Sequence, residues 1–137
     1  MPVNDTCLTG AIGEQLFASH FLENRIFFSQ PVYDLWGADY VVEWQGALHK
    51  VNVKTMYKKQ KEKSSFYQVN LTCGNLNKRR YDLNKITYFG IVNIFYKRIW
   101  MVPNSESIQK SLVYFGPLES RRRLNVNSFD WEKYRIR

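Results

Sequence analysis

The chain has 137 residues, of which 45% are hydrophobic and 16% aromatic; this suits a single folded domain over residues 1–137 and excludes a disordered tail. Its formal net charge of +8 favours a polyanionic partner, either a nucleic acid or an anionic membrane surface. The two cysteines form no disulfide framework or metal-ligand pattern, and no stretch approaches the roughly 18 apolar residues that span a bilayer, so we expect a soluble, cytoplasmic protein without a signal peptide.

The first predicted element is a helix over residues 9–25, with Thr9 as its cap. At 100° per residue, one apolar stripe consists of Phe17, Ala18, Phe21 and Leu22. Glu14 lies on the same inward face, where a carboxylate is costly unless it is paired or binds a cation. Glu14 is therefore either a candidate metal ligand or a partly exposed residue that the helix dipole favours near the N-terminus.

A β-hairpin is predicted next. Residues 37–44 and 48–55 are rich in β-branched and aromatic side chains, which favour strands. Gly46 can adopt the positive φ that a two-residue turn needs, so Trp44 pairs with Ala47.

This register brings three polar side chains together. Asp39 falls directly opposite Asn52, and Lys54 lies two residues further along the same face. Opposed Cβ atoms are about 5 Å apart and diagonal ones about 7–8 Å, so an acid, an amide and an amine converge on one patch. The alternative is that these residues and Lys50 form the solvated polar face of an edge hairpin.

The other elements complete an α/β domain with a central mixed sheet flanked by helices. Further strands are predicted at residues 26–28, 66–71, 86–95 and 97–102, of which 86–95 is the most apolar. The remaining segments are predicted to be a charged loop at 58–65, an irregular stretch or a helical turn at 74–83, and a short helix at 130–135.

Three basic clusters fall in predicted loops and are candidate nucleic-acid contacts: Lys58, Lys59, Lys61 and Lys63; Lys78, Arg79 and Arg80; Arg121, Arg122 and Arg123. Four aromatic residues near these clusters or near Asp39 could stack on bases or sugars: Trp36, Tyr57, Tyr67 and Tyr81. The alternative is that the charges serve solubility and the aromatic residues belong to the core.

The convergent polar patch suits phosphodiester hydrolysis. A divalent cation relieves the repulsion between phosphate and hydroxide and lowers the pKa of a bound water. Asp39 and Glu14 can supply the hard carboxylate oxygens that Mg²⁺ prefers, and Asn52 can supply a neutral amide oxygen. Lys54 can orient the attacking water or neutralise developing charge.

The pattern Asp39-(x)12-Asn52-Val53-Lys54 resembles the D-(x)n-(E/Q)-x-K signature of the PD-(D/E)XK nuclease superfamily. Around it, residues 12–14, 38–42 and 51–55 resemble three successive blocks of small group I intron homing endonucleases and archaeal-type Holliday junction resolvases. Residues 87–92 and 99–103 resemble the two strands that close the domain in the intron-endonuclease group. The resemblance extends from about residue 10 to residue 103.

The resemblance implies a restriction-endonuclease-like core that uses Mg²⁺ or Mn²⁺ to cut duplex or branched DNA. It further implies that Glu14, Asp39, Asn52 and the backbone carbonyl of Val53 are metal ligands and that Lys54 is the catalytic lysine. The expected assembly is a homodimer or higher homo-oligomer with no membrane partner, and a phage or mobile-element origin fits this group. Two departures are Asn52, which is shorter than the family's Glu or Gln, and the missing proline before Asp39.

Three classes of function remain open. The leading one is a metal-dependent DNA endonuclease, with the site-specific homing type ahead of the junction-resolving type because residues 51–55 and the late strands resemble homing enzymes better. The second is a catalytically weak or inactive nuclease-fold protein that acts as a DNA- or RNA-binding module, with Asn52 as a sign of lost activity. The third is a protein-interaction domain that binds an acidic partner.

Overall fold

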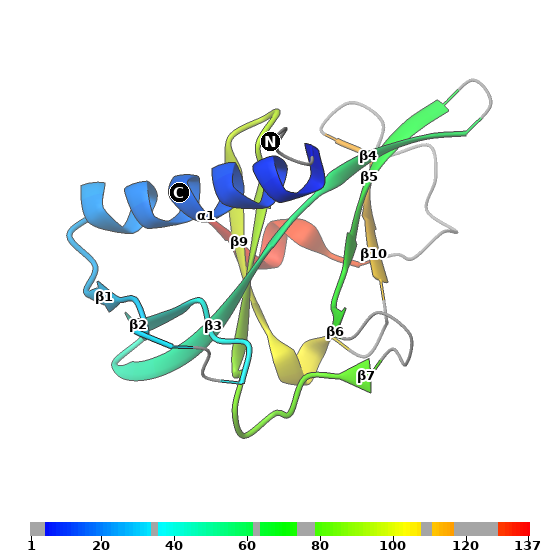
Figure 1. Ribbon diagram of the computed structural model, residues 1–137. Coiled ribbons are helices and arrows are strands. Elements are labelled where there is room, and N and C mark those ends of the chain that lie inside the picture. The colour runs from blue at the N-terminus through cyan, green and yellow to red at the C-terminus, as the bar shows by residue number, and fades with distance from the viewer. Residues whose placement is uncertain (1–4, 34–35, 62–63, 74–78, 108–110, 117–128) are drawn as a thin grey trace.

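The computed structural model describes residues 5–33, 36–61, 64–73, 79–107, 111–116 and 129–137. Its centre is a six-stranded mixed sheet in the order β1-β2-β3-β8-β9-β11 (Figure 1). The strands are β1 (Phe28–Ser29), β2 (Tyr40–Trp44), β3 (Ala47–Thr55), β8 (Tyr88–Asn93), β9 (Arg98–Pro103) and β11 (Arg135–Ile136). Strands β3 and β8 are parallel and the other neighbours are antiparallel, which confirms the predicted mixed sheet.

Helix α1 (Asp5–Glu23) packs on one face of this sheet and buries Phe17 and Phe21. The helix is already formed at Asp5, so the prediction that Thr9 caps its start is wrong and Thr9 lies within the helix. The apolar stripe is also narrower than predicted, because Leu22 is 69% exposed. Within the described ranges, no helix combines the length and apolar character that crossing a lipid bilayer requires.

A smaller sheet covers the other face, where residues of β5, β8, β9 and β10 share one apolar cluster. It consists of β4 (Tyr57–Lys61), β5 (Ser64–Asn70) and β10 (Ser111–Tyr114), in the order β10-β5-β4. The 3₁₀-helix η2 (Trp131–Tyr134) lies between the two sheets in Figure 1, and its Trp131 joins the same cluster. Three further short elements lie in the described ranges: β6 (Thr72–Cys73), its partner β7 (Arg79–Arg80) and the 3₁₀-helix η1 (Asn104–Glu106).

The prediction of a charged loop over residues 58–65 is wrong for the part that the structure describes. Strand β4 pairs antiparallel with β5, from Tyr57 opposite Gln68 to Lys61 opposite Ser64. Among the described strands, β4 lies at the edge of its sheet, and its Lys58 is exposed. Charged residues are common on edge strands because they discourage unwanted pairing, so the charge that suggested a loop belongs to an edge strand.

Gly90 in β8 allows α1 to approach the sheet closely. A Cβ atom at this position would lie 2.3 Å from Cε2 of Phe17, whose side chain is fully buried. We expect Gly90→Ala to lower the free energy of unfolding by about 1–3 kcal/mol, because the ring of Phe17 must move in a packed core. Thermal and urea unfolding of the variant measure this effect.

The matched control is Gly10→Ala, because a Cβ atom at Gly10 meets nothing within 4 Å. Gly10 lies inside α1, so alanine there should stabilise the helix by up to about 1 kcal/mol. Equal shifts of the melting temperature for the two variants would contradict the close packing at Gly90.

Candidate active site

The site forms beside the last residues of β3, which extend past the first residue of β2. The predicted register is confirmed, since Trp44 pairs with Ala47 and Tyr40 with Val51. Strand β2 begins at Tyr40, whereas β3 extends to Thr55, so no β2 residue pairs with the last part of β3. Asp39 occupies this gap: its N–H donates to the carbonyl of Val51 at 2.9 Å.

The carboxylate of Asp39 takes the place of a strand neighbour for β3. Its Oδ2 accepts a hydrogen bond from the N–H of Val53 at 2.7 Å. The N–H and C=O of one strand residue project to the same side, so the carbonyl of Val53 faces this gap as well. The gap thus brings a carboxylate and a backbone carbonyl together.

Asn52 lies against Asp39 as the hairpin register predicts. Its Nδ2 donates to Oδ2 of Asp39 at 3.3 Å and to the carbonyl of Gly37 at 2.6 Å. The side-chain oxygen Oδ1 is buried and has no hydrogen-bond partner among the described residues. A buried acceptor without a partner costs free energy, and a cation or a water could satisfy it.

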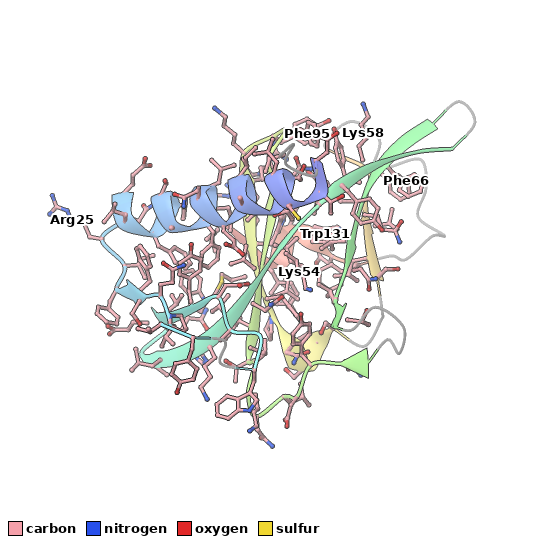
Figure 2. The ribbon with its side chains drawn as sticks, viewed as in Figure 1. Arg25, Lys54, Lys58, Phe66, Phe95 and Trp131 are labelled. Carbon is pink, nitrogen blue, oxygen red and sulfur yellow. The ribbon has the colours of Figure 1, made fainter. Side chains whose placement is uncertain are left out.

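Lys54 lies on the same face of β3 as Asn52, two residues further along. Its Nζ donates to the hydroxyl of Tyr81 at 2.9 Å and to the carbonyl of Thr72 at 3.5 Å. Figure 2 shows Lys54 near the centre of the molecule, between β3 and β5. The ring of Tyr81 packs edge-on against Phe89, with ring centroids 5.5 Å apart. This packing fixes the Tyr81 hydroxyl, which in turn holds the ammonium group of Lys54 in place.

This role of Tyr81 was not predicted, because the sequence suggested only that its ring could stack on a base or sugar. The two residues are 27 positions apart and meet through tertiary packing, so no local pattern signals their contact. For Tyr67 the stacking prediction is wrong, since that ring is only 9% exposed and belongs to the core. Trp36 and Tyr57 are exposed, as stacking requires.

Glu14 reaches the site from α1, on the other face of the sheet. Gly13 makes this approach possible, because a Cβ atom there would lie 1.8 Å from Oγ1 of Thr55. The pKa of the Glu14 carboxyl is raised by burial, by the charge of Asp39 and by a side-chain hydrogen bond with Asp39. The two neighbouring carboxylates repel each other, and together they attract a cation.

A pocket of about 570 Å³ connects the helix side of the site with β3. Glu14, Val53 and Lys54 all contribute to its wall. The other lining residues come from the start of α1, the end of β3 and the start of β4: Asp5, Thr6, Thr9, Gly10, Thr55 and Tyr57. The structure therefore brings Glu14, Asp39 and Asn52 together at the gap beside β3. Lys54 follows on the same strand and lines the same pocket as Glu14, from the opposite face of the sheet.

The donor set at the gap fits a hard divalent cation. Within the described ranges no group of three or more His, Cys, Asp or Glu side chains is placed to hold a metal, so a cation here would be held by two carboxylates, those of Glu14 and Asp39. Mg²⁺ is commonly bound by one or two carboxylates, with waters and substrate oxygens completing its shell. The unpartnered Oδ1 of Asn52 and the carbonyl of Val53 are further oxygen donors at the same place.

The predicted nucleic-acid contacts are only partly described. Lys58, Lys59 and Lys61 lie on the edge strand β4, and the side chain of Lys58 is exposed. Arg79 and Arg80 form β7, and the guanidinium group of Arg80 donates to the carbonyl of Ser107. Two predicted positions and one whole cluster lie outside the described residues: Lys63 and Lys78, and the cluster Arg121, Arg122 and Arg123.

The raised pKa of Glu14 predicts a specific pH dependence. The folded protein holds this proton more tightly than the unfolded chain, so the stabilising contribution is present at low pH and is lost as the pH rises through the folded pKa. A divalent cation should reverse that loss. We expect Mg²⁺ to raise the melting temperature more at about pH 8 than at about pH 5, and Glu14→Gln to remove most of the difference.

Glu43→Gln is the matched control for this measurement, because Glu43 is an exposed carboxylate on β2. Its melting temperatures should follow those of the wild type with and without Mg²⁺. A pH-independent Mg²⁺ effect that persists in Glu14→Gln would count against Glu14 as a cation ligand.

A helix on a mixed sheet, with an aspartate in a strand gap and a lysine on the neighbouring strand, is the arrangement that the PD-(D/E)XK resemblance predicts. The sequence model of PD-(D/E)XK endonucleases matches residues 4–134, and the chain belongs to this family of nucleases.

Among solved structures, the chain is similar to a bacterial homing endonuclease, I-Ssp6803I. The two share 21% sequence identity and superpose with a TM-score of 0.76, over 96% of this chain and 89% of the other. This likeness confirms the restriction-endonuclease-like fold. No curated protein sequence matches the chain significantly.

Proposed function

We propose that the chain is a metal-dependent DNA endonuclease that hydrolyses phosphodiester bonds, with Asp39, Glu14, Asn52 and Lys54 as its catalytic residues. The observation that carries this proposal is the position of Asp39. Its carboxylate interacts with Glu14 on one side and accepts a hydrogen bond from the N–H of Val53 on the other. Val53 belongs to β3, the strand that also carries Lys54. The family match supports nuclease chemistry, and the carboxylate pair supports the need for Mg²⁺ or Mn²⁺.

Glu14 and Asp39 would hold the cation, with Oδ1 of Asn52 and the carbonyl of Val53 as further donors. When bound, the cation would offset the negative charge of the phosphate and lower the pKa of a bound water. Asp39 is fixed for this task because the N–H of Val53 and Nδ2 of Asn52 both donate to its Oδ2. Fixed donors and acceptors need little rearrangement as charge develops, which lowers the barrier.

Lys54 would act on the attacking water and on the developing negative charge. Its ammonium group is held by Tyr81, and it lines the same pocket as Glu14. Because Tyr81 already holds the ammonium group in place, Lys54 loses less side-chain entropy when the phosphate binds.

The preferred substrate is one long site in linear duplex DNA, as for a homing enzyme. The similarity of the fold to I-Ssp6803I supports this choice over junction resolution. Junction resolution is the second candidate. Glu14 would be the additional carboxylate seen in resolvase-like members, and its interaction with Asp39 supports this reading. In either case we propose a homodimer, since two strands must be cut.

Cleavage of a panel of substrates tests the proposal. Supercoiled plasmid, linear duplex, single-stranded DNA and a four-way junction are each incubated with Mg²⁺, with Mn²⁺ or with EDTA. We expect cleavage of duplex that carries the recognised site with either cation and none with EDTA. A preference for the junction over matched duplex selects the resolving function instead.

Binding without cleavage on all four substrates would select the inactive DNA-binding module. Cleavage that continues in EDTA would contradict the metal dependence. Light scattering of the purified protein, alone and with duplex, tests the proposed dimer.

A further inference from the structure

An exposed tryptophan beside the site has two lysine side chains over its ring. The indole of Trp36 is 54% exposed. The ammonium nitrogen of Lys85 lies 3.7 Å from the ring centroid, and that of Lys50 lies 4.8 Å from it. Each contact is an attraction between a cation and the electron-rich ring face, and together they bring two positive charges close to one ring.

The backbone at Trp36 also departs from the usual conformation. Its φ is +53°, in the left-handed region that a bulky side chain rarely adopts. Such a conformation costs free energy, and strained positions concentrate at functional sites. Burial does not explain the strain here, because more than half of the residue faces solvent.

The group lies next to the candidate active site. Alternate residues of a strand share a face, so Lys50, Asn52 and Lys54 point to the same side of β3. With a rise of about 3.3 Å per residue, the Cα atom of Lys50 is about 7 Å from that of Asn52 and about 13 Å from that of Lys54. Trp36 directly precedes Gly37, whose carbonyl accepts the hydrogen bond from Asn52.

The two positive charges have no described anionic partner. Both ion pairs found within the described ranges involve Glu132, on the 3₁₀-helix η2. Two ammonium groups held near one ring, without a described counter-charge, suit a ligand that carries regularly spaced negative charges. An exposed indole next to them suits a ligand with apolar surface beside each charge.

We infer that Trp36, Lys50 and Lys85 form a binding site for the DNA backbone next to the cleaved bond, an inference that rests on the proposed function. The two ammonium groups contact phosphates on either side of one nucleotide, and the indole packs against its deoxyribose or base. The ring also holds both lysines in place before DNA arrives. The site therefore fixes the path of one strand toward Lys54.

The salt dependence of duplex binding tests this inference in EDTA, where no cleavage is expected. Each phosphate contact contributes about −0.9 to the slope of log K against log salt. We expect Lys50→Gln and Lys85→Gln each to reduce the magnitude of this slope by about 1. The control Lys133→Gln removes an equal charge from an exposed lysine that also lies over a ring, that of Tyr134, and should leave the slope unchanged.

Tryptophan variants separate the ring from the charges. Trp36→Ala should weaken duplex binding roughly threefold to tenfold. Trp36→Phe keeps an aromatic ring and should therefore bind duplex with nearly the wild-type affinity. In the wild type, duplex should protect part of the tryptophan fluorescence from acrylamide, and Trp36→Phe should lose the protected component. The protection itself is measured on the wild type, so it does not depend on whether a substitution destabilises the fold.

Unchanged slopes in both lysine variants, or quenching that duplex does not affect, would overturn the inference even if the protein cleaves DNA. Equal displacement of duplex by poly-glutamate would also overturn it and select an acidic protein as the partner. If the slopes change as expected but no substrate is cut, the binding site stands and the proposed catalysis fails.

Discussion

Asp39→Asn is expected to reduce DNA cleavage at least about 100-fold and to leave the fold intact. Both hydrogen bonds from Val53 and Asn52 end on the single oxygen Oδ2, so the amide oxygen of asparagine can accept both. The variant therefore keeps these two hydrogen bonds and loses the negative charge beside Glu14. Loss of a residue that merely orients a metal ligand costs about 10–100-fold, and loss of a ligand costs more.

Initial cleavage rates over a range of Mg²⁺ concentrations, together with the melting temperature, measure this effect. The melting temperature in EDTA should equal or exceed that of the wild type, because the repulsion between Asp39 and Glu14 is removed. Asp130→Asn is the matched control, since Asp130 is exposed and makes no capping hydrogen bond at η2. Cleavage by Asp39→Asn at the wild-type rate would contradict the catalytic role of Asp39.

Lys54→Met is expected to reduce the cleavage rate by about 100-fold or more. Methionine keeps most of the length of the side chain and loses the ammonium group that faces Tyr81. Removal of one group that stabilises transition-state charge typically costs 10²–10³-fold in kcat. Because the group is proposed to act in the transition state, kcat should fall much more than the affinity for duplex measured in EDTA.

Tyr81→Phe separates positioning of Lys54 from its chemistry. The ring and its contact with Phe89 remain, and only the hydroxyl is lost. We expect a smaller decrease in rate, about 10-fold, and a changed pH profile of cleavage, because the surroundings of the ammonium group change. Equal rates for Lys54→Met and the wild type would contradict the role of Lys54 whatever Tyr81→Phe does.

The sequence was sufficient to predict those parts of the site that depend on local rules. Turn chemistry at Gly46 predicts the register of the hairpin, and the register places Asp39 opposite Asn52. Helical periodicity places Glu14 on the face of α1 that packs on the sheet. These relations involve neighbours along one hairpin or one helix, so the pattern of side chains determines them.

Contacts between distant elements could not be predicted in this way. The hydrogen bond from Lys54 to Tyr81 depends on how the segment after β7 returns to the central sheet. The lysines over Trp36 come from β3 and from the segment before β8, which the parallel pairing of these strands brings together. Strand β4 was missed because an edge strand can carry the composition of a loop.

The most direct test of the proposed catalysis is the position of a bound Mn²⁺ ion, measured by anomalous scattering from crystals of the wild-type protein grown with Mn²⁺. We expect one peak in the gap beside β3, between the carboxylates of Glu14 and Asp39 and next to Val53, and no such peak in Asp39→Asn. An ordered ion elsewhere, with the gap empty in an enzyme that needs Mn²⁺ to cut DNA, would contradict the assignment of these residues.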